Sequence, residues 1–325
     1  MKTSNRFGKA LPGLALGLAA VAAVAALSAA LVAQDSDTTR GIVAEEFVKA
    51  RPAKQGAASA KVPSYKLVGA GSKSVTMASL RPNSADAREL GITIWRLRPS
   101  VSSDGGPRIL VQEGADTIAW TPERVPSDTP LRQGDRVRLT IESPRTGYLY
   151  VIDREQYANK EQGDPYLISP TTRINNGDNQ VTAGRLVEIP AQEDRPNYFT
   201  LRQSRPDQSG EVLSVIVTDK PLEGITPGPK ALALSAEQVE KWEQASSSQV
   251  QRFEMTGGAG KTWTKAEQEA GLDGTRLLTQ DDPGPQTIYR VTVKADQPIL
   301  VKVGLKYSSA PKPVKTAAAK STPGN

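Results

Sequence analysis

Residues 135–154 read DRVRLTIESPRTGYLYVIDR, and this stretch decides the fold. In its first half Val137, Leu139 and Ile141 alternate with polar residues, which is the period-two pattern of a strand with one buried face. The YLYVI run that follows is apolar on both faces, so we expect a strand that is covered on two sides and lies in the middle of a sheet. Between the two, SPRTG contains the Pro and the Gly of a tight turn. The sequence therefore predicts that these strands are adjacent antiparallel neighbours at the centre of the protein.

Further strands must join this pair, because an isolated hairpin is only marginally stable in water. Short segments rich in β-branched and aromatic residues recur along the chain and are separated by turn residues. This pattern predicts a mainly β protein, an antiparallel β-sandwich or jelly roll, whose body runs from residue 85 to residue 307. The other expected strands are residues 90–97, 108–112, 166–168, 186–189, 198–201 and 212–218, with a closing hairpin at residues 286–307.

One or two short helices are expected in an insertion at residues 232–272. Ser235 is followed three residues later by Gln, which is a capping pattern for the start of a helix. Val239 and Trp242 then fall on one face of that helix, and we expect this face to pack on the sheet. Thr264, with Glu three residues later, predicts the start of a second short helix.

Composition removes many kinds of active site. The 325 residues include no Cys and no His, which excludes thiol nucleophiles, Ser-His-Asp and Cys-His catalysis and nearly all zinc and haem sites. The net charge of +6 is carried by the two ends, because residues 1–33 and 306–325 contain three and four basic residues and no acidic ones. The remaining net charge is −1, so nothing in the body predicts a nucleic-acid partner.

Residues 1–33 predict export. Lys2, Arg6 and Lys9 precede an unbroken apolar run, and small residues after it offer cleavage sites, as in a signal peptide. The alternative is an uncleaved anchor, because residues 11–33 are long enough to span a bilayer. The first interpretation predicts a periplasmic or extracellular protein, and the second a single-pass inner-membrane protein with its body outside the cytoplasm.

Two polar segments flank the body. Residues 34–84 are rich in Ala, Ser, Lys and Pro, which predicts a partly disordered linker, although TRGIVAEEFVKARP within it is expected to dock weakly on the body. Residues 308–325 form a basic Pro/Ala/Lys segment with no apolar face, which predicts a disordered tail.

Residues 257–262, GGAGKT, resemble part of a phosphate-binding loop. The pattern requires a Gly five residues before Gly260, where this chain has Met255, and a preceding apolar parallel strand, where it has SSSQVQRF. We therefore expect a flexible loop that leads to the Thr264 cap.

Four carboxylates, Asp153, Glu155, Glu161 and Asp164, follow the most apolar strand and are the weak candidates for catalysis. Two of them at a suitable distance would make the acid pair of a hydrolase. Two basic residues lie among them, which favours solvated loop charges, and no catalytic residue is assigned.

A calcium site drawn from Asp164, Asn175, Asn176 and Asp178 has the right oxygen ligands. The Asn-Asn-Gly-Asp run lacks the spaced acids and the distal Glu of an EF-hand loop, so a plain Asn-Gly turn is preferred. We predict no metal and no cofactor.

Tyr148, Tyr150, Tyr198 and Phe199 form an aromatic set at strand spacing. They would either line a ligand-binding face or fill the core of a sandwich, and the second interpretation is preferred because aromatic side chains at this spacing usually pack inside.

The segments GDRVRLTIESPRTGYLYVIDRE, PYLISP, NNGDNQVTAGRLVEIP, YFTL and EVLSVIVT resemble the bacterial family known as domain of unknown function 4384, over roughly residues 131–221. The resemblance implies an extracytoplasmic β-rich module of a kind sometimes attached to caspase-like, signalling or envelope domains, with no catalytic residues to carry over. Family members commonly have Phe before the Pro of PYLISP, where this chain has Ser169. Because no partner catalytic domain follows, the resemblance favours a binding or scaffold role.

The expected function is thus an exported, non-catalytic module that binds an envelope protein or an extended peptide, by strand addition at an exposed sheet edge. One alternative is a cell-wall hydrolase that uses the loop carboxylates. The other is a membrane-tethered structural protein. The sequence leaves the oligomeric state open.

Overall fold

The computed structural model describes residues 46–53, 63–68, 86–113, 115–246, 249–272, 274 and 276–308. The expected export segment and nearly all of the expected tail lie outside the described residues. Two pieces of the expected linker, residues 46–53 and 63–68, are described, and both pack on the body. No helix among the described residues is long and apolar enough to cross a membrane.

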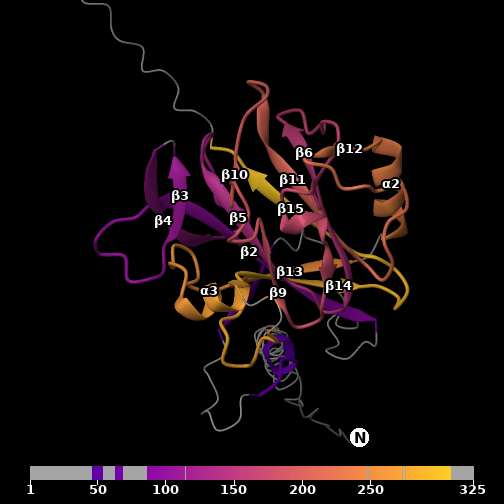
Figure 1. Cartoon of the computed structure of the whole chain (residues 1–325). Coiled ribbons are helices and arrows are strands. Elements are labelled where there is room, and N and C mark those ends of the chain that lie inside the picture. Colours follow the sequence, from indigo (N-terminus) through magenta and orange to yellow (C-terminus); the bar gives the residue numbers. More distant parts are fainter. Residues whose placement is uncertain are drawn as a thin grey trace, which may run out of the picture.

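The described residues form an antiparallel β-sandwich of two sheets with short helices on the outside (Figure 1). The prediction of a mainly β sandwich is therefore confirmed. The nine-stranded sheet has the order β1-β13-β14-β2-β4-β3, with β5 attached to β2, and β9 and β10 attached to β5. The six-stranded sheet has the order β12-β7-β6-β11-β15, with β8 attached to β6. The strands are β1 (Tyr65–Val68), β2 (Ala87–Pro99), β3 (Ile109–Glu113), β4 (Asp116–Val125), β5 (Arg136–Glu142), β6 (Gly147–Tyr157), β7 (Tyr166–Ser169), β8 (Gln180–Val181), β9 (Leu186–Ile189), β10 (Phe199–Thr200), β11 (Gln208–Thr218), β12 (Leu232–Ala233), β13 (Val250–Met255), β14 (Thr287–Thr292) and β15 (Ile299–Lys306).

The strand β2 organises the nine-stranded sheet because it is long enough to serve several partners. Along one side its first half pairs with β14 and its second half with β4, and along the other side it pairs with β5. The sheet therefore divides into two branches, one through β14, β13 and β1 and one through β4 and β3.

The predicted pairing of the two central strands is wrong. β5 belongs to the nine-stranded sheet and β6 to the six-stranded sheet, so the turn of residues 143–147 carries the chain from one sheet to the other. The reason is that both sides of β5 are occupied, one by β2 and the other by β9 and β10. The prediction that β6 lies in the middle of a sheet is confirmed, since β11 pairs with one side of it and β7 and β8 with the other.

The predicted closing hairpin at residues 286–307 is also wrong, because its two strands belong to different sheets. β14 lies between β13 and β2 in the nine-stranded sheet, whereas β15 pairs with β11 in the six-stranded sheet. This connection also crosses between the sheets. The alternating patterns identified the faces that line the core, but they did not identify the partners, nor that the polar face of β5 is buried as well.

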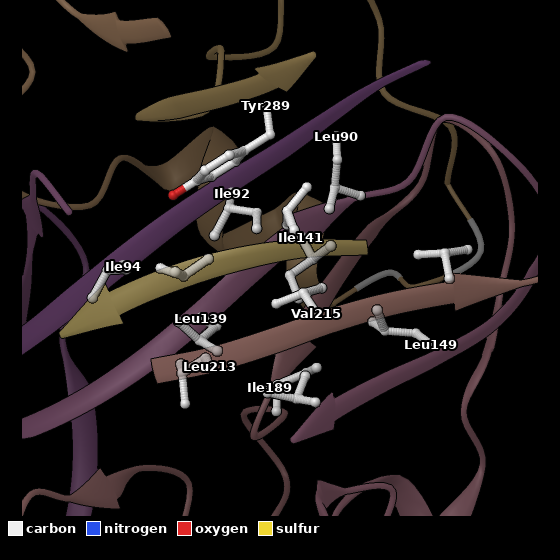
Figure 2. Close-up of a cluster of buried hydrophobic side chains, with 14 of the residues drawn as sticks. Leu90, Ile92, Ile94, Leu139, Ile141, Leu149, Ile189, Leu213, Val215 and Tyr289 are labelled. Atoms are coloured by element: carbon white, nitrogen blue, oxygen red, sulfur yellow. The ribbon is translucent and has the colours of Figure 1, made fainter. Parts of the chain in front are cut away.

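The hydrophobic core fills the space between the two sheets. Its members come from the inner faces of both, and Ile141 of β5 and Val151 of β6 are completely buried. Figure 2 shows side chains of both sheets, among them Ile141 and Val215, meeting in this core. The two central strands therefore face each other across the core, although they do not pair.

The outer face of the six-stranded sheet is covered by helix α2 (Ala236–Ala245) (Figure 1). The side chain of Ser235 accepts a hydrogen bond from the backbone N–H of Gln238, as the capping pattern predicts. Val239 is completely buried against Tyr150 and its neighbours, and Trp242 packs beside it. The prediction that this face of the helix packs on the sheet is confirmed.

The outer face of the nine-stranded sheet is covered differently, by helix α3 (Lys265–Leu272), by the loop before β14 and by residues 46–53. Phe47 and Val48 are buried there. The contacts with this face include three ion pairs whose side chains are all buried, Arg51–Glu142, Arg124–Glu267 and Arg138–Glu188. The indole rings of Trp95 and Trp263 lie among them, with centroids 5.9 Å apart.

Five strands escaped the sequence prediction: the short β1, β8 and β12, and the longer β4 and β13. β13 lies inside the expected helical insertion, and its VQRFEM sequence does not alternate cleanly. β4 contains Pro122, which argued against a strand. Pro122 lies beyond the last residue of β4 that pairs with β3. Its carbonyl accepts a hydrogen bond from the backbone N–H of Trp263, so its nitrogen also faces away from β2 and no hydrogen bond between β2 and β4 is lost.

Candidate functional site

The structure separates the four carboxylates that follow one another in the sequence. Asp153 and Glu155 lie on β6 itself, on the same face as Val151, and therefore point toward the space between the sheets. Glu161 and Asp164 lie in the loop after β6 and are exposed. Of the predicted candidates, the structure brings only the first two together.

A third carboxylate, Glu211, joins this pair from β11. The strand register places Glu211 directly opposite Glu155 and Leu213 opposite Asp153. The hydroxyl of Tyr157 donates a hydrogen bond to Glu155 at 2.6 Å, and the hydroxyl of Tyr307 donates one to Glu211. The sequence alternation of Glu211, Leu213 and Val215 shows the face on which Glu211 lies, but only the register shows its neighbours.

Burial in this cluster raises the pKa of two of the acids, Asp153 and Glu211. Burial and, to a smaller extent, the negative charges of Glu211 and Glu155 raise the pKa of Asp153 to about 8. Burial also raises the pKa of Glu211. One oxygen of Asp153 is buried and has no hydrogen-bond partner within the described ranges. Asp153 therefore holds its proton at neutral pH.

A protonated acid beside a carboxylate is also the arrangement of a glycosidase active site. A substrate needs a cleft, however, and none of four pockets found among the described residues is lined by Asp153, Glu155 or Glu211. A hydrolase site built from these acids therefore stays a prediction.

The Asn-Asn-Gly-Asp run forms a tight turn, as expected. Asn175 and Asn176 adopt left-handed backbone conformations with φ of 47° and 53°, and residues Asn175–Gly177 form one turn of 3₁₀ helix. Asn175 and Asp178 line a pocket of about 230 Å³ at the flank of the sandwich, whereas Asp164 does not. Within the part of the chain that the structure describes, no three His, Cys, Asp or Glu residues are grouped to hold a metal ion.

The four aromatic residues do not share a face. Tyr148 and Tyr150 pack under α2, where the hydroxyl of Tyr150 accepts a hydrogen bond from the backbone N–H of Leu222. The ring centroid of Tyr198 lies 4.6 Å from the central guanidinium carbon of Arg136, which belongs to β5 of the nine-stranded sheet. Phe199 packs against the central core.

The GGAGKT loop connects β13 to the capping box of α3. Thr264 and Glu267 exchange the two hydrogen bonds of that box, and the preceding strand β13 is antiparallel to both of its neighbours. This loop therefore lacks the parallel strand that a phosphate-binding loop requires.

The strand β15 offers an open sheet edge. With eight residues it is the longest described strand that pairs with only one other strand, β11. The backbone N–H of Tyr307 donates to Ser209 in β11, whereas the carbonyl of Lys306 accepts from Leu131 on the other side. Because backbone groups alternate in direction along a strand, those of Lys302 and Gly304 also face away from β11.

A groove of about 520 Å³ runs beside this edge, between β15 and the end of α2. Leu300 and Val250 provide its apolar part. Lys302 donates a hydrogen bond of 2.8 Å to Glu243 of α2 at its side. A Cβ atom placed on Gly304 would meet no other atom within 4 Å, so the face of the sheet is open at this point.

Comparison with known proteins gave no match to a family model, to a curated protein or to a solved structure. The resemblance to the family of domain of unknown function 4384 stays a prediction.

Proposed function

We propose that this chain is an exported, non-catalytic binding module that holds an extended segment of a cell-envelope protein by strand addition to β15. The single observation that carries the proposal is the free edge of β15 beside the groove of α2. In this mode of recognition the main-chain hydrogen bonds of an added strand supply affinity, and neighbouring pockets select its side chains.

The edge of β15 suits a partner strand better than a second copy of itself. Lys302 and Lys306 are exposed along it, and lysines on an edge oppose the pairing of identical strands. An added strand would place an apolar side chain over Leu300 and Val250 and an acidic one near Lys306. Val250 is 45% exposed, which leaves apolar area for the partner to cover.

The composition also supports a binding role. No His or Cys is present, and Asp153, Glu155 and Glu211 line none of four pockets among the described residues. Export is inferred from residues 1–33, and the envelope partner follows from that inference.

Site-specific photo-crosslinking tests the proposal. A photoreactive amino acid replaces Val250 in the groove or, as a matched control, Leu110 on the edge strand β3, since both are exposed apolar strand residues. We expect the probe at position 250, but not the probe at position 110, to crosslink one envelope protein in cells that export the full chain.

Substitutions at Gly304 then test the strand addition itself. Gly304→Pro removes the outward N–H while leaving the pairing with β11 in place, whereas Gly304→Ala retains this N–H. The crosslink at position 250 should disappear in the first variant and persist in the second. A crosslink that survives in a folded Gly304→Pro protein would rule out strand addition at β15.

A further inference from the structure

A second cavity lies on the opposite flank of the sandwich, where the two sheets separate. Its volume is about 230 Å³, below the roughly 300 to 1,000 Å³ of pockets that hold drug-sized ligands. It opens between β9 of the nine-stranded sheet and β8 of the six-stranded sheet, and the end of α3 forms its third wall. A single long side chain or an alkyl chain of that size would fit inside.

The floor of this cavity is apolar because it reaches the central core. Leu149, Ile174, Val181 and Ile189 line it, and each is at most 8% exposed. A ligand that reaches this floor must therefore present a hydrocarbon segment.

The rim is acidic. Asp178 and Glu193 are exposed there, and neither forms an ion pair with a described residue. The carboxylate of Glu188 also lines the cavity, with Arg138 and Gln192 bound to its far side. No Lys or Arg is among the lining residues, so the cavity attracts a cation and disfavours an anion.

A polar group inside the cavity is available for a ligand. Ser169 is only 5% exposed and lies opposite Val151, which places it on the inner face of the six-stranded sheet. Its hydroxyl makes no hydrogen bond to another described residue, and it is not among the polar atoms that are closed off from solvent. The hydroxyl therefore faces the space of the cavity, where water or a ligand can meet it.

We propose that this cavity binds a primary ammonium group carried on an unbranched apolar stem, such as a lysine side chain. The stem lies on Leu149, Val181 and Ile189, and the ammonium group lies at the rim beside Asp178 and Glu193. This site is separate from the strand-addition edge of β15, which lies on the other flank, so either proposal can fail without the other.

Titration of the full chain with n-hexylammonium, monitored through the methyl NMR signals of Val181 and Ile189, tests the inference. We expect saturable shifts, and binding at least tenfold weaker for hexanoate and for hexanol, which have the same stem without the positive charge. Nα-acetyl-lysine amide, which carries the same primary ammonium group on a four-carbon stem, should produce the same shifts if the cavity accepts a lysine side chain, and none if it accepts only simple alkylammonium ions.

Two variants separate binding from folding. Asp178→Asn combined with Glu193→Gln changes only exposed groups, and should weaken hexylammonium binding about tenfold with an unchanged melting temperature. Ser169→Leu fills the cavity and should abolish the shifts. Equal binding of all three hexyl compounds, or unchanged ammonium binding in the folded Asp178→Asn/Glu193→Gln protein, would overturn the proposal.

Discussion

The two outer faces of the sandwich are covered by opposite means. On the six-stranded sheet, α2 packs apolar side chains such as Val239 and Trp242 against an apolar surface. On the nine-stranded sheet, α3 and residues 46–53 cover a surface in which three Arg–Glu pairs are buried beside tryptophan rings. The packing of α2 requires only apolar surfaces that fit together. The packing of α3 and residues 46–53 requires every buried charge to have a partner of opposite sign, because an unpaired buried charge is strongly destabilising.

The largest expected effect is on the charged side. Glu188→Ala leaves the guanidinium of Arg138 buried without its partner, and should lower the free energy of unfolding by about 3 to 5 kcal/mol. Urea unfolding measures this change. The double variant Arg138→Met/Glu188→Leu should be more stable than Glu188→Ala, because it removes both charges. Lys241→Ala, which breaks an exposed pair on α2, is the control and should cost less than about 1 kcal/mol. An equal loss of unfolding free energy in Glu188→Ala and Lys241→Ala would show that the buried ion pair matters no more than the exposed one.

On the apolar side, Val239→Ala removes two buried methyl groups from the contact of α2. We expect a loss of about 2 kcal/mol in the free energy of unfolding, from the lost burial and the cavity left behind. The same substitution at Val250, which is 45% exposed, should change stability by less than about 0.5 kcal/mol. Urea unfolding of both variants checks the difference, and similar values would show that α2 is only loosely attached.

Asp153 sharpens the comparison, since it is a buried acid with no cationic partner. Its pKa is raised by burial to about 8 in the folded protein, above the value of about 3.9 in an unfolded chain. The folded state therefore holds a proton that the unfolded state releases, and stability falls as pH rises from about 4 to about 8. Asp153→Asn should be more stable than the wild type at pH 8, by on the order of 1 to 2 kcal/mol, and this advantage should shrink at pH 5.

Unfolding curves at the two pH values measure this effect, with the exposed Glu161→Gln as a control that should change neither. A constant difference between Asp153→Asn and the wild type at both pH values would show that Asp153 is ionised in the folded protein.

The smallest effect is expected at the start of α2. Ser235→Ala removes the hydroxyl that accepts from the N–H of Gln238, and should cost about 1 kcal/mol in the free energy of unfolding. Ser235→Asp keeps an acceptor at the cap and should retain the stability. Thermal unfolding of both variants distinguishes the capping effect from a general sensitivity of this loop.

The two covers also differ in how far the sequence predicts them. The cap at Ser235 and the Val239–Trp242 face lie within one short segment, so local patterns predicted α2 and its contact with the sheet. The partners in the ion pairs of Arg51, Arg124 and Arg138 are 91, 143 and 50 residues away, and no local pattern connects such positions.

The same limit explains the errors in strand pairing. Alternation correctly identified the core-facing side of β5 and the two-sided burial of β6. The prediction that the other side of β5 is exposed is wrong, because Arg138, Thr140 and Glu142 are also buried. Alternation could not show that β2, β9 and β10 already occupy both edges of β5, which forces β6 into the other sheet. For the acid cluster, Asp153 and Glu155 followed from their place after the YLYV run, whereas Glu211 required the register of β11.

The attachment of residues 46–53 has a mechanical consequence. Arg51 is bound to Glu142 at 2.6 Å and to the carbonyl of Asp282 at 2.8 Å, and these contacts precede β1 and β2 in the chain. A force applied to the chain on the amino-terminal side of Arg51 would act first on the contacts of Arg51. These contacts would transmit the force to β5 and to the loop before β14. The hydrogen bonds between β1 and β13 would bear tension only after the contacts of Arg51 had broken. These contacts therefore protect the sheet from a force applied at that end of the chain.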